Sequence, residues 1–101
     1  MREQILDIVF RQCMETGKEI SSRVLLNPDA ETKLYHSDGN LDSLGLVRFI
    51  SGVEEKIEES FGKDILIADE KAMSRHSSPF ISVGTLTDYI LELMNEDEGS
   101  E

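Results

Sequence analysis

The chain has 101 residues, of which 21 are Asp or Glu and 10 are Lys or Arg, so its formal net charge at pH 7 is −11. This length favours a single domain. So negative a surface repels phosphate backbones and anionic lipid, which disfavours nucleic-acid binding and membrane insertion and favours basic protein surfaces as partners. Cys13 is the only cysteine, which excludes an intrachain disulfide and a zinc site built from cysteines. The start of the chain has no signal-peptide core, so we expect a cytoplasmic protein. We also expect a monomer.

The first segment with helical periodicity lies near the N-terminus. Its apolar residues recur every three to four positions, as on one face of a helix: Ile5, Leu6, Val9, Phe10, Cys13 and Met14. Gly17 is the expected C-cap of this helix. Because Cys13 lies on the apolar face, a buried thiol is favoured over a reactive one.

The stretch from Gly17 to Leu41 shows no strong periodicity and contains Pro28 and the turn-rich "HSDGN". A structureless link of about 25 residues within one domain is unusual and tends to be functional. Five apolar or aromatic residues are candidates to hold it against the helices: Val24, Leu25, Leu26, Leu34 and Tyr35.

The second helical segment runs from about Ser43 to Phe61, with Gly62 as its stop signal. At about 100° per residue, one broad apolar arc emerges and predicts the buried face. It comprises Leu46, Phe49, Ile50, Val53, Ile57 and Phe61, with Val47 at its margin. Leu44 falls among polar residues. Gly45 and Gly52 each cost the helix about 1 kcal/mol relative to Ala, which favours local flexibility.

The third main helix is expected from about Val83 to Met94, with Ser82 as its N-cap. Before it, "IADEKAMS" predicts a short helix capped by Asp69, and Pro79 ends that segment. Residues 95–101 are expected to be a disordered acidic tail. The prediction is an all-α domain over residues 1–94, a small four-helix bundle of three main helices and one short helix with a long loop after the first helix.

The stretch "LDSLG", residues 41–45, is the candidate site. On pattern alone, Ser43 is an N-cap. A nucleophile elbow and a G-D-S-L hydrolase signature both fail because Leu41 stands where a glycine belongs. A calcium loop starting at Asp38 fails because Ser43 takes the place of the turn glycine and Phe49 that of the bidentate glutamate.

His36 and His76 show no spacing typical of a metal site, so we expect solvated loop histidines and no metal. A small serine hydrolase is disfavoured because the sequence has no identifiable base for it.

A fourth interpretation of Ser43 is compatible with the cap. The N-terminus of a helix offers unpaired N–H groups and a partial positive charge, so it accommodates a phosphodiester on the serine.

The segment "GNLDSLGLVRFISGVEEKIEESFG" resembles the helix that carries the prosthetic group in acyl and peptidyl carrier proteins. Its "DSL" core, Asp42-Ser43-Leu44, matches the family's attachment motif. The order of an N-terminal helix, a long loop, the modified helix, a short helix and a final "TDYILEL" helix is also similar, over about residues 2–94. Gly45, Arg48 and the two-residue spacing between Gly39 and Asp42 depart from fatty-acid carriers and are closer to stand-alone D-alanyl or aminoacyl carriers.

This resemblance implies that Ser43 receives 4′-phosphopantetheine from coenzyme A, with Asp42 and Leu44 beside it. It implies a strip that docks basic partner surfaces, formed by Leu44, Val47, Arg48, Glu54, Glu55, Glu58 and Glu59. The expected partners are a phosphopantetheinyl transferase, a loading ligase or acyltransferase, and a downstream synthase or transferase.

The expected function is a carrier rather than an enzyme. It would hold acyl or aminoacyl intermediates as thioesters for fatty-acid, polyketide or related biosynthesis. The alternative is an unmodified, acidic helical adaptor that binds basic surfaces through the same face. Mass spectrometry after exposure to an active transferase separates the two.

Overall fold

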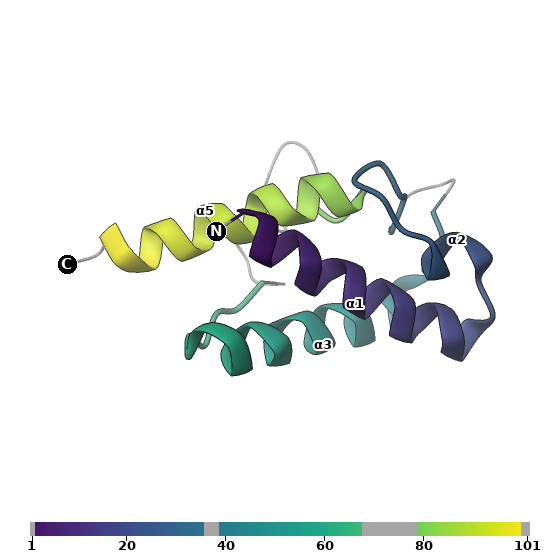
Figure 1. Ribbon diagram of the computed structural model, residues 1–101, viewed down its shortest axis with the longest axis horizontal. Helices are drawn as coiled ribbons and strands as arrows, with labels where there is room; N and C mark the ends of the chain where they lie inside the picture. Colours follow the sequence, from purple (N-terminus) through teal and green to yellow (C-terminus); the bar gives the residue numbers. More distant parts are fainter. Residues whose placement is uncertain (1, 36–38, 68–78, 100–101) are drawn as a thin grey trace.

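The computed structural model describes residues 2–35, 39–67 and 79–99. The predicted all-α class is confirmed, since these ranges contain four helices and no strand (Figure 1). The helices are α1 (Arg2–Ile20), α2 (Arg23–Leu26), α3 (Ser43–Phe61) and α5 (Val83–Gly99). None of the helices in the described ranges has an apolar stretch long enough to cross a membrane. The short helix predicted over residues 67–74, with its cap Asp69, falls almost entirely outside the described residues.

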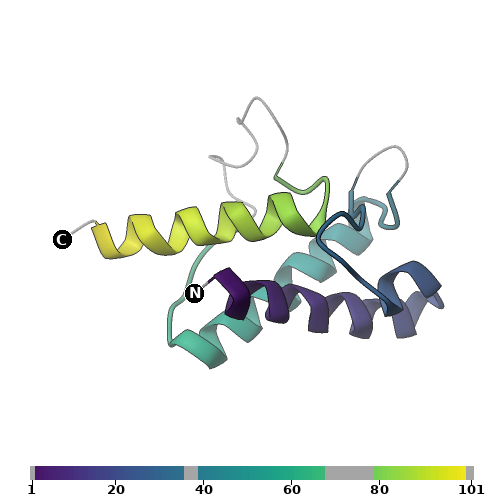
Figure 2. The ribbon, with the colours of Figure 1, turned by 45° about the horizontal axis from the view of Figure 1, so that its top comes forward.

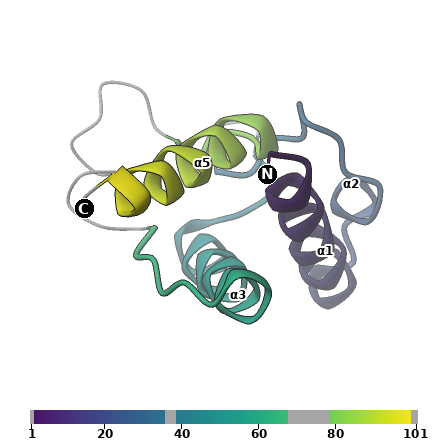
Figure 3. The same cartoon turned by 60° about the vertical axis from the view of Figure 1, so that its left-hand side comes forward.

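Helix α1 packs against each of the other three helices. Figure 3 shows α1, α3 and α5 on three sides of a common centre, which their apolar faces fill. The largest fully buried side chains come from all four helices and from the connections: Phe49, Ile5, Leu25, Leu34, Ile57, Ile67, Leu86, Ile90 and Met94. The core is therefore shared by the whole described chain, with no second cluster that would indicate another domain.

Helix α3 has the bounds that the sequence predicts. Gly62 ends it in the left-handed conformation, with φ 67°, and its N–H donates to the carbonyl oxygen of Glu58 at 2.8 Å. Five of the predicted core positions are buried, and Phe61 is half-buried: the five are Leu46, Phe49, Ile50, Val53 and Ile57. Val47 and Leu44 are exposed. Helical periodicity thus located both the buried and the exposed face correctly.

The first helix does not end at Gly17, as the sequence suggested, but continues to Ile20. Ser21, with φ 56°, makes the turn, and the N–H of Ser22 donates to the carbonyl of Gly17 at 2.9 Å. Gly17 is instead a packing residue. A Cβ at this position would lie 3.0 Å from the backbone nitrogen of Leu26 and 3.1 Å from the carbonyl carbon of Leu25. The glycine lets α2 lie directly on α1.

We therefore expect Gly17→Ala to destabilise the protein, although alanine favours helices. The helix gains about 1 kcal/mol from the substitution, but the backbone of α2 must move, and overpacking of this kind costs roughly 1–3 kcal/mol. Urea unfolding of Gly17→Ala, beside Lys18→Ala on the exposed face of the same helix, measures the difference. A more stable Gly17→Ala protein would mean that the close approach of α2 is not required.

The stretch from Gly17 to Leu41 was predicted to be structureless, and this prediction is wrong, because the stretch contains α2. Ser22 caps this short helix by accepting from the N–H of Leu25 at 3.3 Å. Of the five residues expected to hold the segment, Leu25 and Leu34 are fully buried and Leu26 is half-buried. Val24 and Tyr35 remain 52% and 40% exposed. Four residues are too few for periodicity to reveal a helix.

A polar seam joins α1 to α3. The ammonium of Lys56 donates to Oε1 of Gln12 at 2.9 Å and pairs with the carboxylate of Glu15 at 2.7 Å, while Nε2 of Gln12 donates to the hydroxyl of Thr16 at 3.2 Å. A Cβ on Gly52 would collide with the amide of Gln12. Gly52 therefore makes room for a partly buried hydrogen-bond network, a structural role that the sequence pattern did not indicate.

Cys13 is fully buried in this core, as predicted. Burial raises the pKa of its thiol to about 12, because the thiolate would lose its hydration there. The reactive thiolate form is therefore scarce at neutral pH, and the residue serves as a small apolar side chain.

The last helix begins as predicted and ends later. The hydroxyl of Ser82 accepts from the N–H of Thr85 at 3.3 Å, which confirms Ser82 as the N-cap. Beyond Met94 the backbone stays helical to Gly99, so the acidic segment expected as a tail from residue 95 is helical over its first five residues. These turns extend past the ends of α1 and α3 (Figures 1 and 2). The segment after Met94 has no apolar residue that would continue the periodicity, whereas adding residues to a formed helix is inexpensive.

Candidate functional site

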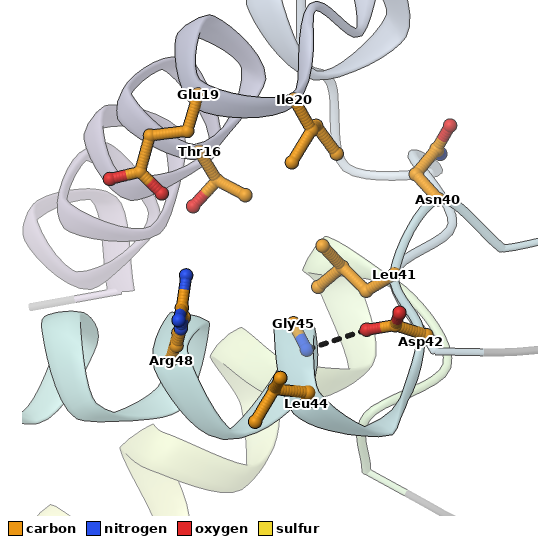
Figure 4. Close-up of a pocket in the computed structure, with 9 residues that line it drawn as sticks. All are labelled: Thr16, Glu19, Ile20, Asn40, Leu41, Asp42, Leu44, Gly45 and Arg48. Atoms are coloured by element: carbon orange, nitrogen blue, oxygen red, sulfur yellow. Dashed lines mark hydrogen bonds between the residues drawn. The ribbon is translucent and has the colours of Figure 1, made fainter.

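The N-cap of α3 is Asp42 and not Ser43. The backbone of Asp42 is extended, and its carboxylate accepts from the N–H of Gly45 at 2.7 Å (Figure 4). The carbonyl of Asp42 accepts from Leu46 at 2.9 Å as the first bond of the helix. Both residue types cap helices well, so the pattern could not decide between them. Ser43 is the first helical residue, and its exposed hydroxyl has no capping role.

We expect Asp42→Ala to lower the free energy of unfolding by about 1 kcal/mol, since it leaves the Gly45 N–H without its acceptor. Asp42→Asn is the matched control, because an amide oxygen in the same place still accepts. Ser43→Ala should leave stability nearly unchanged. Urea unfolding of the three variants checks the assignment, and a larger loss from Ser43→Ala than from Asp42→Ala would contradict it.

The hydroxyl of Ser43 has one partner among the described residues. The phenol oxygen of Tyr35 lies 3.1 Å from Ser43 Oγ, and either group can donate. Both side chains are exposed. The contact joins the end of the segment after α2 to the first turn of α3.

Tyr35 is held in place by its backbone. Its N–H donates to the carbonyl of Phe80 at 2.9 Å, and the preceding N–H, that of Leu34, donates to Ile81 at 2.7 Å. Leu34 is fully buried, and its carbonyl accepts from the N–H of Leu41 at 3.0 Å. The segment before α5 and the residues before α3 thus anchor the backbone from which the phenol reaches Ser43.

A pocket of about 370 Å³ lies between the end of α1 and the start of α3 (Figure 4). Its lining combines charged, polar and apolar residues: Thr16, Glu19, Ile20, Asn40, Leu41, Asp42, Leu44, Gly45 and Arg48. Arg48 points across it toward α1 in this view. Ser43 and Tyr35 are not among its lining residues, although Asp42 and Leu44 on either side of the serine are.

Gly45 has a use that the sequence did not reveal. A Cβ there would lie 3.0 Å from the capping oxygen of Asp42 and 3.5 Å from the side chain of Leu41. The glycine therefore leaves room for the cap itself, in addition to lining the pocket.

The residues predicted to dock partners are mostly exposed. Leu44 and Val47 are 65% and 60% exposed and form an apolar pair on the outside of α3. The other exposed members are Arg48, Glu55, Glu58 and Glu59. Glu54 differs, since its half-buried carboxylate accepts from the N–H of Ile67 at 2.7 Å and so holds the segment after α3. Glu54 therefore has a structural role that the sequence pattern did not indicate.

Within the described ranges, no three His, Cys, Asp or Glu side chains gather as metal ligands would. His36 and His76, which we expected to be solvated, lie outside those ranges. Comparisons with protein-family models, with curated proteins and with solved structures found no match.

One residue of the site, Tyr35, was not predicted as such from the sequence. Tyr35 was predicted as an anchor of the loop, yet its phenol contacts the candidate serine. No spacing rule connects a loop tyrosine to a serine eight positions later, because the contact depends on the path of the chain between them. Its only signal in the sequence is a polar tip on an otherwise apolar side chain.

Proposed function

We propose that this protein is a carrier that holds acyl or aminoacyl intermediates on a 4′-phosphopantetheine arm attached to Ser43. One observation supports this proposal most strongly. The serine of an Asp-Ser-Leu motif stands exposed at the first position of a long helix, and the cap beside it is supplied by another residue. The Ser43 hydroxyl is therefore not needed to cap the N-terminus of α3.

The residues present suit such a group. The first turn of a helix has N–H groups without intrahelical partners, and the partial positive charge there favours a phosphodiester. Gly45 has no side chain that would crowd this turn. Leu44 beside it is uncharged, so it does not repel an incoming enzyme by charge. When bound, the arm supplies a terminal thiol that holds the cargo as a thioester.

The attachment itself is a phosphoryl transfer in which Ser43 is the acceptor. A bond forms between Ser43 Oγ and the phosphorus next to the pantetheine. The bond from that phosphorus to adenosine 3′,5′-bisphosphate breaks, and the serine proton passes to a base on the transferase. In the proposed role the carrier contributes an accessible oxygen at a fixed place, while the catalytic groups belong to the partner.

Partner enzymes would dock on the outer face of α3. Leu44 and Val47 offer an apolar contact near the serine, and three exposed carboxylates follow along the helix: Glu55, Glu58 and Glu59. With a net charge of −11, the protein attracts basic surfaces over distances of about a Debye length. Charge of this kind acts mainly on the association rate.

We expect the double variant Glu55→Lys and Glu59→Lys to slow modification of Ser43, chiefly by lowering the association rate with the transferase. The loss should shrink as salt is raised, because screening weakens exposed charge pairs beyond about 8–10 Å. Glu3→Lys with Glu31→Lys is the matched control, since it makes the same change in net charge on other elements. Equal rates for both double variants across a salt series would show that position along α3 does not matter.

The competing function is an unmodified adaptor that binds basic proteins through the same exposed face. The same apolar pair and carboxylates support it. Incubation with coenzyme A and a promiscuous transferase, followed by intact mass spectrometry, decides between the two. Addition of one phosphopantetheine supports the carrier, whereas an unmodified protein that still binds basic partners supports the adaptor. A carrier role also agrees with the cytoplasmic location expected from the sequence, which fractionation of the cell tests.

A further inference from the structure

The hydrogen bond between Tyr35 and Ser43 is unusual because it uses the one hydroxyl that the proposed function needs to be free. The oxygens lie 3.1 Å apart, at the surface, and neither side chain contributes to the cap of α3. The N–H of Tyr35 donates to the carbonyl of Phe80, and the N–H of its neighbour Leu34 donates to that of Ile81, so the backbone at the tyrosine is anchored to the residues before α5. The fold therefore places the Tyr35 backbone where the phenol oxygen reaches Ser43 Oγ.

We propose that Tyr35 is a positioning residue for the modification of Ser43, an inference that rests on the proposed carrier function. An exposed serine hydroxyl without a partner samples all three staggered rotamers. A hydrogen bond from a fixed phenol favours one of them and so presents the oxygen in one direction. Such orientation lowers the barrier of the transfer step, since fewer arrangements must be found on the docked enzyme.

The phenol neither gains nor loses a proton in the transfer. When Tyr35 donates to Ser43 Oγ, the serine proton remains available to the base of the transferase. After the transfer, Ser43 Oγ is an ester oxygen and can no longer donate. The phosphodiester then offers charged acceptor oxygens, with which a phenol makes a stronger hydrogen bond than with a neutral hydroxyl. Tyr35 thus favours the modified state as well as the approach to it.

Tyr35→Phe tests this inference, because it removes the phenol oxygen and keeps the ring. Initial rates of modification by coenzyme A and a promiscuous transferase are measured against carrier concentration for the wild type and the variant. We expect kcat to fall about 3- to 10-fold, as suits the loss of one hydrogen bond, with KM unchanged. Ser60→Ala, which removes an exposed hydroxyl at the other end of α3, should match the wild type. Circular dichroism and melting curves establish that both variants fold.

A second measurement does not depend on turnover. In the modified proteins, the ³¹P resonance of the phosphodiester should shift between the wild type and Tyr35→Phe, and should not shift in Ser60→Ala. Unchanged kcat together with an unchanged resonance overturns the inference, and so does a raised KM at constant kcat, which would make Tyr35 a docking residue. A wild type that accepts no group overturns the carrier function, and the role of Tyr35 with it.

Discussion

Ser43→Ala should abolish the addition of phosphopantetheine completely, while the protein stays folded. The variant removes the only hydroxyl of the Asp-Ser-Leu motif, and with it the acceptor oxygen of the transfer, so a higher enzyme concentration cannot restore the reaction. Stability should change by less than about 1 kcal/mol, because Asp42 keeps the cap and the lost hydrogen bond to Tyr35 is exposed. Intact mass spectrometry after incubation with coenzyme A and a transferase measures the first effect, and urea unfolding the second.

The chain offers a matched control in Ser51, an exposed serine two turns further along the same helix. Ser51→Ala should be modified as fast as the wild type, since it does not stand at the helix N-terminus. Labelling of the Ser43→Ala protein would move the attachment site elsewhere. Failure of the Ser51→Ala control would indicate damage to the docking face of α3.

Ile57→Ala should cause the largest loss of stability among these variants. The side chain is fully buried between the helices, and removing it leaves a cavity in a core that is close-packed. Substitutions of this kind cost roughly 2–5 kcal/mol. The total free energy of unfolding of a domain of this size is only about 5–15 kcal/mol. Part of the Ile57→Ala population would therefore unfold at low urea. Chemical unfolding followed by circular dichroism gives the value.

Two valines on α3 make the comparison quantitative. Val53 is fully buried and Val47 is 60% exposed, so the same chemical change is made in two environments on one helix. Val53→Ala should be clearly destabilising, whereas Val47→Ala should stay within about 0.5 kcal/mol of the wild type. Equal losses at the two sites would mean that α3 does not bury the face described here.

Local signals in the sequence determined the all-α class and most of α3. Its buried face follows from the repeat of apolar residues, and its end follows from Gly62, because both depend on neighbours within a turn or two. The start of α5 at Ser82 has the same origin. The exposed position of the Asp-Ser-Leu motif at a helix start was also predictable, although the choice of Asp42 over Ser43 as the cap was not.

Contacts between distant segments were decided by the tertiary structure. Gly17 looks like a helix end but permits α2 to lie against α1, and Gly52 looks flexible but makes room for Gln12. Glu54 looks like one more surface carboxylate, yet it accepts from the backbone of Ile67. In each case the deciding neighbour lies too far along the chain for helical spacing to reveal it.

At the candidate site, the sequence determined the position of Ser43, and the tertiary structure determined that of Tyr35. The motif around Ser43 is readable in the sequence because its geometry is that of one helix turn. Tyr35 reaches the serine only because its backbone is bonded to the residues before α5, which lie more than forty positions further along the chain. A hydrogen bond of this kind depends on how the helices pack. The sequence therefore determined the candidate site, and the fold alone determined that Tyr35 is the hydrogen-bond partner of Ser43.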